Sequence, residues 1–368
     1  MSHAVIPAPV RFEVGAGPEF VFRPGTAVGY AEAGLAPVVE RFCSQVTRRA
    51  GLTLEPTARD PAPDGPSVKV ELGTGGELAT LAAPAGVSPA GRDPADERYS
   101  LALDGDQIVL RAVELAGVAR GLTTLMQLMV TSPTASAAEL RLPDMRILDA
   151  PRYAWRGLSL DLARTWLTVA EIRRVIDLLG LYKFNVLHLH LTDDQSWRLP
   201  VGRPAGKPDP GAPFYPREDL RALVAYAADR FVTLVPEIDT PGHVTALVRL
   251  HPELETGRNH VEFEFSPGRK HRIIWLDPEL PATVELIEQV LADLAANFPC
   301  PYIHIGGDEA RGMPHDLYAP RLAGLAHKAW STPQPAGWAV HRDRLARHGR
   351  LWDQDDLTYF RCSTVDWL

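Results

Sequence analysis

The residues of this sequence with the clearest chemical potential are two adjacent carboxylates, Asp308 and Glu309. They follow the apolar run Tyr302–Ile305 and the pair Gly306-Gly307. Adjacent side chains of a strand point to opposite faces, but glycines allow the chain to leave the strand and aim both acids at one place. Neighbouring carboxylates can divide acid and base roles, because one of them readily keeps its proton. A solvated acid pair opening a helix would give the same sequence, so the pair alone leaves both interpretations open.

Polar side chains also follow three earlier segments that are predicted to be parallel strands. The carboxyl ends of such strands meet at one mouth of the sheet, where α/β enzymes carry out their chemistry. Polar groups at four successive strand ends are hard to explain by solvated loops alone. The four polar segments are Asp161–Arg164, His190–Arg198, Pro236–His243 and Gly306–Glu309.

Several residues of these segments have two interpretations each. Arg164 could bind substrate or could be a surface cation beside a helix. His188 and His190 share one face of their strand, so they could be metal ligands or interior histidines with hydrogen-bond partners. His243 follows Pro241-Gly242, and a tight turn there would place His243 at the rim of the site.

The chain from Ala150 onward alternates predicted strands and helices, which indicates a (β/α) TIM-type barrel of the α/β class. Thr168 followed by Glu171 is a capping-box pattern and predicts a helix that begins at Val169. The strand Phe184–Leu191 is almost continuously apolar, as expected for a parallel strand covered on both faces. The other predicted elements are strands Gly157–Leu162, Phe231–Val235 and Tyr302–Ile305 and helices Val169–Leu181, Pro216–Asp229 and Pro278–Phe298.

The residues before about Leu148 predict a small α+β domain without a cluster of chemically active groups. The dipeptide Asp104-Gly105 suits a tight turn and predicts a hairpin between the two strands that flank it. The predicted strands are Val10–Val14, Phe20–Phe22, Val68–Leu72, Tyr99–Leu103 and Ile108–Leu110, and the predicted helices are Leu35–Ala50 and Val113–Val130.

Composition and charge argue against several classes of function. The formal net charge of -8 is mildly acidic and gives no electrostatic case for binding nucleic acid or an anionic membrane. Cys43, Cys300 and Cys362 are far apart and lack CxxC spacing, so neither a disulfide framework nor a zinc site is predicted. No apolar run reaches the roughly 20 residues that span a bilayer. The first residues lack signal-peptide features, so we expect a cytoplasmic protein unless a leader has been lost.

The motifs together resemble the family 20 glycoside hydrolases, the β-N-acetylhexosaminidases. The matching residues are Trp155–Leu158 with Asp161–Arg164, His190–Arg198, Pro236–His243 and His304–Glu309, and Gly121–Leu128 resembles the closing helix of the family's α+β domain. The resemblance implies three parts. They are an N-terminal α+β domain over 1–148, the first part of a catalytic (β/α) barrel over 149–338, and a divergent tail over 339–368.

The resemblance also implies a reaction, the retaining and substrate-assisted hydrolysis of terminal β-linked N-acetylhexosamine, without a metal ion or other cofactor. In this mechanism the 2-acetamido oxygen of the substrate is the nucleophile and forms an oxazolinium intermediate. Asp308 would orient the acetamido nitrogen. Glu309 would protonate the leaving oxygen and later activate water. Whether GlcNAc or GalNAc is preferred is left open.

Four further residues receive roles from the resemblance. Arg164 would hold hydroxyls of the terminal sugar through its guanidinium donors. Trp338 would line the acetamido pocket. Asp193 and His243 would form a buried pair that supports the acid without contacting the substrate.

The later part of the sequence departs from the family pattern. The family's barrel has eight strands, and the residues after Glu309 are too few for four more βα units of about 30 residues each. Gly337-Trp338 resembles the end of the fifth strand, and residues 339–368 match none of the later strands. The sequence therefore predicts an incomplete barrel, as expected of a truncated or divergent copy.

Two other functions remain open on the sequence. The chain could be an inactive or sugar-binding remnant that lacks part of its pocket. The run His188-Leu189-His190 with nearby acids could also indicate a metal-dependent barrel hydrolase. The family resemblance accounts for more of the residues than the metal hypothesis does.

Overall fold

The computed structural model of the protein describes residues 5–61, 65–89, 96–134, 138–202, 213–266 and 268–309. The chain divides into two compact units. The first unit contains residues 1–190, 215–236 and 294–303, and the second contains 191–214, 237–293 and 304–368. The first unit joins the predicted N-terminal domain to the first predicted barrel strands. Compactness alone therefore does not mark the boundary that we predict after residue 148.

A seven-stranded mixed sheet forms the N-terminal part of the first unit, with the order β1-β9-β6-β7-β5-β3-β4. β6 and β7 pair antiparallel from Asp104 and Gln107 onward, which confirms the hairpin predicted from Asp104-Gly105. β5 pairs in parallel with both β3 and β7. The strands are β1 (Arg11–Val14), β3 (Thr26–Tyr30), β4 (Leu54–Thr57), β5 (Ser67–Leu72), β6 (Tyr99–Asp104), β7 (Gln107–Ala112) and β9 (Met145–Asp149), and β2 (Phe20–Phe22) pairs separately with β8 (Leu140–Leu142).

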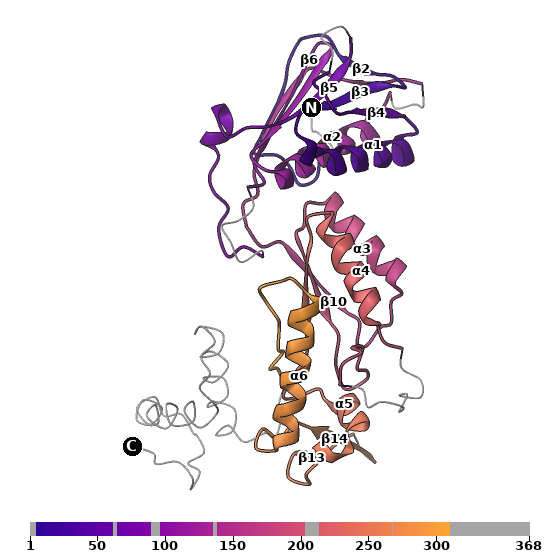
Figure 1. Ribbon diagram of the computed structural model, residues 1–368, viewed down its shortest axis with the longest axis vertical. Coiled ribbons are helices and arrows are strands. Elements are labelled where there is room, and N and C mark those ends of the chain that lie inside the picture. The colour runs from indigo at the N-terminus through magenta and orange to yellow at the C-terminus, as the bar shows by residue number, and fades with distance from the viewer. Residues whose placement is uncertain are drawn as a thin grey trace, which may run out of the picture. The chain divides into compact units, whose positions relative to one another are not determined.

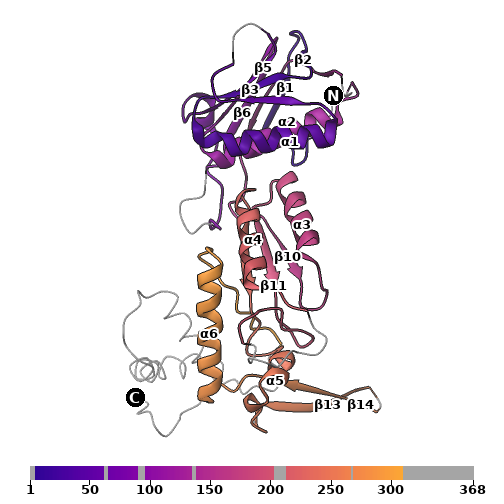
Figure 2. The ribbon, with the colours of Figure 1, turned by 45° about the vertical axis from the view of Figure 1, so that its right-hand side comes forward.

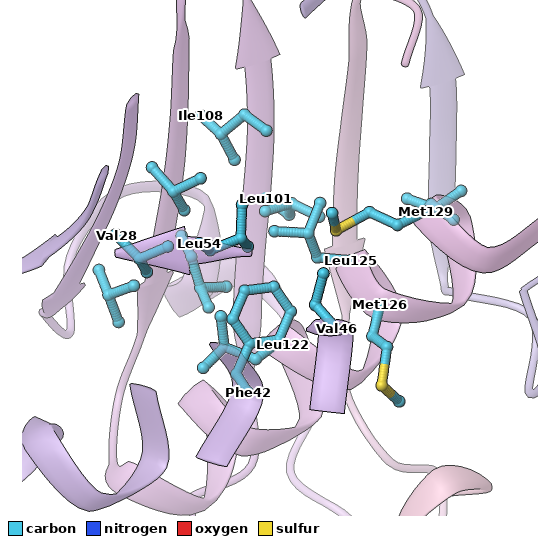
Figure 3. Close-up of a cluster of buried hydrophobic side chains, with 14 of the residues drawn as sticks. Val28, Phe42, Val46, Leu54, Leu101, Ile108, Leu122, Leu125, Met126 and Met129 are labelled. Carbon is cyan, nitrogen blue, oxygen red and sulfur yellow. The ribbon is translucent and has the colours of Figure 1, made fainter. Parts of the chain in front are cut away.

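Two helices, α1 (Ala36–Ala50) and α2 (Leu115–Thr131), lie side by side on one face of this sheet (Figures 1 and 2). The helix predicted over Leu35–Ala50 is present as α1, and Phe42 and Val46 point from its buried face into the core. Figure 3 shows these two side chains beside Leu122 and Leu125 of α2. Burial of this apolar surface is the main force that holds the helices on the sheet.

The first barrel strands form a three-stranded sheet in the order β10-β11-β12, with β10 and β11 in parallel. The helix α3 begins where the capping box predicted, because Thr168 Oγ1 accepts the Glu171 N–H at 3.3 Å and Glu171 Oε2 accepts the Thr168 N–H at 2.7 Å. The elements are β10 (Gly157–Asp161), α3 (Val169–Leu181), β11 (Val186–His190), α4 (Arg217–Ala228) and β12 (Thr233–Glu237).

The segment Tyr302–Ile305, predicted to be the fourth barrel strand, is not a full strand in the structure. It meets the end of β12 through a single parallel bridge between Glu237 and His304. Pro236 and Pro301 lack the N–H groups that a longer ladder would need. The predicted strand is therefore wrong in extent, although its C-terminal part lies beside the end of β12.

The second unit contains elements that the sequence patterns did not predict. The helix α5 (Thr245–Leu250) is short, and the hairpin of β13 (His260–Ser266) and β14 (Arg269–Ile274) is visible in Figure 2. The long helix α6 (Pro281–Asn297) was predicted. Short 3-10 turns occur at Ala33–Leu35, Gly76–Thr80 and Pro252–Leu254. Among the described helices, none combines the length and the apolar character needed to cross a lipid bilayer.

A buried ionic network lies within the first unit. Lys183 Nζ is 2.7 Å from Asp149 Oδ2 and 2.8 Å from the Tyr99 hydroxyl, which itself donates to Asp149 Oδ2 at 2.7 Å. Burial lowers the pKa of Lys183 and, with the nearby Asp149 charge, raises the pKa of Tyr99. The network joins β6 and β9 to Lys183, two residues after the end of α3. Its charges are compensated only while all the partners are present.

Replacing Asp149 with Asn removes the charge that compensates the Lys183 ammonium while preserving the shape of the side chain. We expect the free energy of unfolding to fall by about 3–5 kcal/mol, because the buried cation loses its partner. Urea denaturation followed by circular dichroism measures the change. The matched control is Arg141→Ala, which breaks an exposed ion pair with Glu139 and should cost less than about 1 kcal/mol. Equal small losses in both variants would show that Lys183 does not depend on Asp149.

Candidate active site

The acid pair lies directly after a backbone turn built from two glycines. Gly306 and Gly307 have φ angles of +66° and +110°, in the region that glycine adopts most readily. A Cβ added at Gly306 would lie 1.9 Å from Oδ1 of Asp239, and the same oxygen accepts the Gly307 N–H at 3.2 Å. The side chains of Asp308 and Glu309 are 69% and 56% exposed, so they face solvent. A buried carboxylate therefore holds the turn that presents the two acids.

The residues before the turn are anchored to those that follow β12. The N–H of Ile238 donates to the carbonyl of His304, and the N–H of Thr240 donates to the carbonyl of Ile305, both at 3.0 Å. The Thr240 hydroxyl also donates to the Ile305 carbonyl at 3.2 Å. These hydrogen bonds fix the position of the acid pair relative to the end of β12.

His243 lies between the acid pair and two carboxylates of the loop that follows β11. Its Nδ1 is 3.4 Å from Asp193 Oδ1 and 3.4 Å from Asp194 Oδ2. Its Nε2 is 3.7 Å from Asp308 Oδ2 and 3.7 Å from Glu309 Oε2. The structure thus brings together four residues predicted from the sequence, namely Asp193, His243, Asp308 and Glu309. Positive charge on the ring would act on both groups of acids.

The side of the His243 ring that faces the acid pair is unsatisfied within the described residues, since Nε2 is buried without a hydrogen-bond partner there. A separation of 3.7 Å is too long for a hydrogen bond. Catalytic contacts commonly shorten when a substrate binds. His243 also has a φ of +52°, an uncommon conformation for a residue other than glycine.

Asp194 was not among the predicted site residues, although it lies next to Asp193 in the polar segment His190–Arg198. Its Oδ1 accepts the N–H of Thr245 at 3.1 Å and the hydroxyl of Thr245 at 2.6 Å, while its Oδ2 faces His243. Asp194 thereby ties the start of α5 to the loop after β11. The sequence shows only that Asp193 and Asp194 are adjacent. The fold shows that both carboxylates lie beside the ring of His243.

Asp239 is the second site residue that sequence reasoning missed. Its side chain is buried, and burial raises its pKa to about 6 from 3.8. The Gly307 N–H opposes this shift, and the negative charge of Asp308 adds to it. The backbone N–H of Asp239 donates to Thr192 Oγ1 at 2.9 Å. Asp239 belongs to the segment Pro236–His243, but no sequence pattern indicated that Gly306 and Gly307 would contact its side chain.

The two predicted substrate-binding residues are Arg164 and Trp338. Arg164 lies in the first compact unit, where its Nη1 donates to Asp161 Oδ2 at 2.8 Å and its N–H donates to Asp161 Oδ1 at 3.0 Å. Asp161 therefore directs the guanidinium of Arg164. Trp338 and the predicted tail 339–368 lie outside the described residues.

Two groups of side chains in the second unit have ligand atoms close enough for one cation. They are Asp193, Asp194 and His243, and Asp239, His243 and Asp308, with ligand atoms within 4.8 Å of one another. Carboxylate oxygens and an imidazole nitrogen can bind divalent metals. In each group one acid oxygen already accepts protein hydrogen bonds, at Asp194 Oδ1 and Asp239 Oδ1. The metal-dependent alternative stays a hypothesis.

Comparison with known proteins identifies the family. The model of the glycosyl hydrolase family 20 catalytic domain matches residues 153–336, which is half of the chain, and the model of domain 2 of the same family matches residues 2–150. The chain belongs to glycosyl hydrolase family 20. The resemblance stated from the motifs is confirmed.

Relatives of this family 20 chain carry the same class of name. It is 38% identical over 337 residues to a beta-N-acetylhexosaminidase of Cellulomonas fimi, covering 88% of this chain and 62% of the relative. It is 34% identical over 231 residues to a beta-hexosaminidase of Vibrio furnissii, covering 57% of this chain and 37% of the relative. The chain thus spans less than two thirds of the length of either relative.

Solved family 20 structures share its fold. The N-acetyl-beta-hexosaminidase of Streptomyces plicatus in complex with Thio-NAglucal matches with a TM-score of 0.71 and 27% identity, over 95% of this chain and 72% of that one. The beta-N-acetylhexosaminidase of Streptomyces coelicolor matches with a TM-score of 0.69 and 26% identity, over 99% and 74%. These likenesses confirm the predicted fold class, a TIM-type barrel domain preceded by a small domain.

Replacing Gly306 with Ala in this family 20 chain should displace the turn before the acid pair. The new Cβ would collide with Asp239, and the left-handed backbone would be strained as well. The control is Gly257→Ala, because Gly257 has a similar φ of +64° with nothing within 4 Å of an added Cβ. We expect Gly306→Ala to lower the free energy of unfolding by about 1–3 kcal/mol more than the control does. Equal losses in urea denaturation would contradict the close contact.

The raised pKa of Asp239 predicts a specific pH dependence. An acid whose folded pKa lies above its unfolded value stabilises the fold when protonated, below about pH 4, and this contribution is lost as the pH rises through about 6. Asp239→Asn removes the titration and keeps an oxygen for the Gly307 N–H. The stability of this variant relative to wild type should therefore rise by about 3 kcal/mol between pH 4 and pH 7. A constant difference across that range, measured by urea denaturation, would refute the assignment.

Proposed function

We propose that this chain hydrolyses terminal, non-reducing β-linked N-acetylhexosamine by a retaining, substrate-assisted mechanism. The observation that carries the proposal is the position of His243, which lies between the buried carboxylate of Asp193 and the acid pair Asp308 and Glu309. Membership of family 20, a substrate-assisted exception among glycoside hydrolases, supports the reaction class. The substrate is an amino-sugar glycoside.

In the first step, the carbonyl oxygen of the 2-acetamido group attacks C1 of the same sugar, and the bond from C1 to the leaving oxygen breaks. Glu309 gives its proton to that oxygen, so the aglycone leaves as a neutral alcohol. Asp308 accepts the acetamido N–H and stabilises the positive charge that develops on the oxazolinium ring. The exposure of both acids leaves them accessible to a substrate arriving from solvent.

In the second step, Glu309 acts as the base. It takes a proton from water, the water oxygen attacks C1, and the oxazolinium ring opens to restore the acetamido group. Two displacements at C1 give net retention of configuration, and Glu309 ends protonated, ready for the next cycle.

His243 and Asp193 act through the acids rather than on the substrate. Asp193 is buried beside Nδ1 of the ring, which favours a proton on that nitrogen and fixes the ring orientation. With the proton on Nδ1, Nε2 carries a lone pair and faces Asp308 and Glu309, so it can accept a hydrogen bond from a protonated acid when the 3.7 Å contact shortens. We assign the sugar hydroxyls to Arg164, whose guanidinium Asp161 directs, and the acetamido pocket wall to Trp338.

The purified chain tests the function with two chromogenic substrates. It should hydrolyse 4-nitrophenyl N-acetyl-β-glucosaminide and leave 4-nitrophenyl β-glucoside, which lacks the acetamido nucleophile, intact. Addition of EDTA should not change the rate. Equal turnover of both substrates would contradict substrate assistance, and loss of activity with EDTA would favour the metal-dependent alternative. A folded chain that binds N-acetylglucosamine without turnover would be the sugar-binding remnant.

Replacing Glu309 with Gln tests its role as acid and base. We expect kcat/KM to fall by about 10²–10⁴-fold for substrates with a poor leaving group, because protonation of the leaving oxygen is lost. The loss in the first step should be smaller for 4-nitrophenol, which leaves without a proton. Glu285→Gln, an exposed acid on α6, is the matched control and should keep the full rate. The same loss for all leaving groups would refute the assignment.

A further inference from the structure

A cavity of about 50 Å³ within the first compact unit is lined by four arginines and a single carboxylate. Arg41 and Arg49 come from α1, Arg120 comes from α2, Arg230 follows α4, and the carboxylate is Asp177 of α3. One water needs about 10–15 Å³ of such volume, so the cavity has room for a group the size of phosphate. Nothing in the proposed reaction uses these residues.

The cavity has an apolar floor and one open wall. Phe42, Leu122 and Met126, labelled in the buried cluster of Figure 3, also line the cavity. On the side of α3, a Cβ added at Gly180 would meet no heavy atom within 4 Å. The floor is therefore firmly packed, while the space beside Gly180 can accept an additional group without moving the protein.

Two of the four arginines are already compensated. Arg120 Nε donates to Glu97 Oε1 at 2.7 Å, and Arg230 Nε donates to Asp177 Oδ1 at 2.5 Å. The Asp177 carboxylate also accepts the Tyr226 hydroxyl at 3.0 Å. Glu97 is thus committed to Arg120, and Asp177 is committed to Arg230.

Neither of the other two arginines forms an ion pair with a carboxylate in the part of the chain that the structure describes. Arg41 Nη2 reaches only the carbonyl of Pro37, at 3.3 Å, and Arg49 makes no ion pair there. Burial and the like charge of Arg230 lower the pKa of Arg41, while the negative charges of Asp229 and Asp177 oppose this shift in part. The lining of the cavity carries four positive charges and one negative charge, with Arg41 half-buried and Arg49 exposed, and a bound anion would reduce the repulsion among the arginines.

We propose that this cavity is a binding site for a tetrahedral dianion, either inorganic phosphate or the phosphate of a phosphomonoester. Arg41 and Arg49 supply the two charges that match a dianion, and guanidinium groups bind phosphate oxygens through paired N–H donors. Arg230, paired with Asp177, lies at the wall of the cavity. Arg41 and Arg49 lie two helical turns apart on the face of α1 that lines the cavity.

Isothermal titration calorimetry with inorganic phosphate, at constant ionic strength and pH 7.5, tests the site on the full chain. Wild type should give a saturable heat with one site. Arg41→Ala and Arg49→Ala should each weaken the affinity by about tenfold or more, the loss expected for a charge-assisted pair. The matched control is Arg48→Ala, an exposed arginine of α1 outside the cavity, which should bind as wild type. Absence of saturable heat in wild type, or unchanged affinity in Arg41→Ala and Arg49→Ala, would overturn the proposal.

A second variant tests the same site without removing an arginine. Gly180→Glu places a carboxylate beside the open space, so it should abolish phosphate binding while circular dichroism stays that of wild type. Unchanged binding in this variant would also overturn the proposal. Titration with glucosamine 6-phosphate separates the two sources of the anion. Tighter binding than inorganic phosphate indicates a phosphomonoester, and equal or weaker binding indicates the free anion.

Discussion

The acid pair depends on one close contact, that between the backbone of Gly306 and the carboxylate of Asp239. Only a residue without a Cβ can approach an oxygen so closely, and the N–H of Gly307 donates a hydrogen bond to the same oxygen. The contact determines where the chain leaves the strand direction. It therefore decides where Asp308 and Glu309 emerge relative to His243. A buried acid that touches no substrate in the proposed reaction controls the geometry of the two acids that do.

The fold was largely predictable where local patterns and tertiary packing agree. The capping box at Thr168, the helix predicted over Leu35–Ala50 and the hairpin after Asp104 each rest on local signals, and the structure contains all three. β3 and β4 were missed because their alanine, glycine and proline residues weaken the strand pattern, while parallel pairing stabilises them. The fourth barrel strand was predicted too long because the apolar run Tyr302–Ile305 favours a strand. Pro236 and Pro301 lack the N–H groups that a longer pairing with β12 would need.

The sequence predicted which residues belong to the site better than it predicted the contacts between them. Polar residues at strand ends pointed to Asp193, His243, Asp308 and Glu309, because the topology of a parallel sheet gathers strand ends. Asp194 and Asp239 could not be singled out in the same way. Their importance comes from contacts to a ring and to a glycine backbone that are distant in sequence. Periodicity and spacing do not encode such contacts, which exist only after the loops have folded.

His243 and Glu309 both have left-handed backbone conformations, with φ of +52° and +47°. Residues with a Cβ adopt such angles at a cost, and glycine adopts them freely. At these two positions the protein therefore has side chains whose backbone conformation lowers the stability of the fold. Selection for thermal tolerance alone would favour glycine there, and a library screened only for resistance to heat would gradually lose its imidazole and its carboxylate. Any engineering of this scaffold has to screen for turnover and tolerance together.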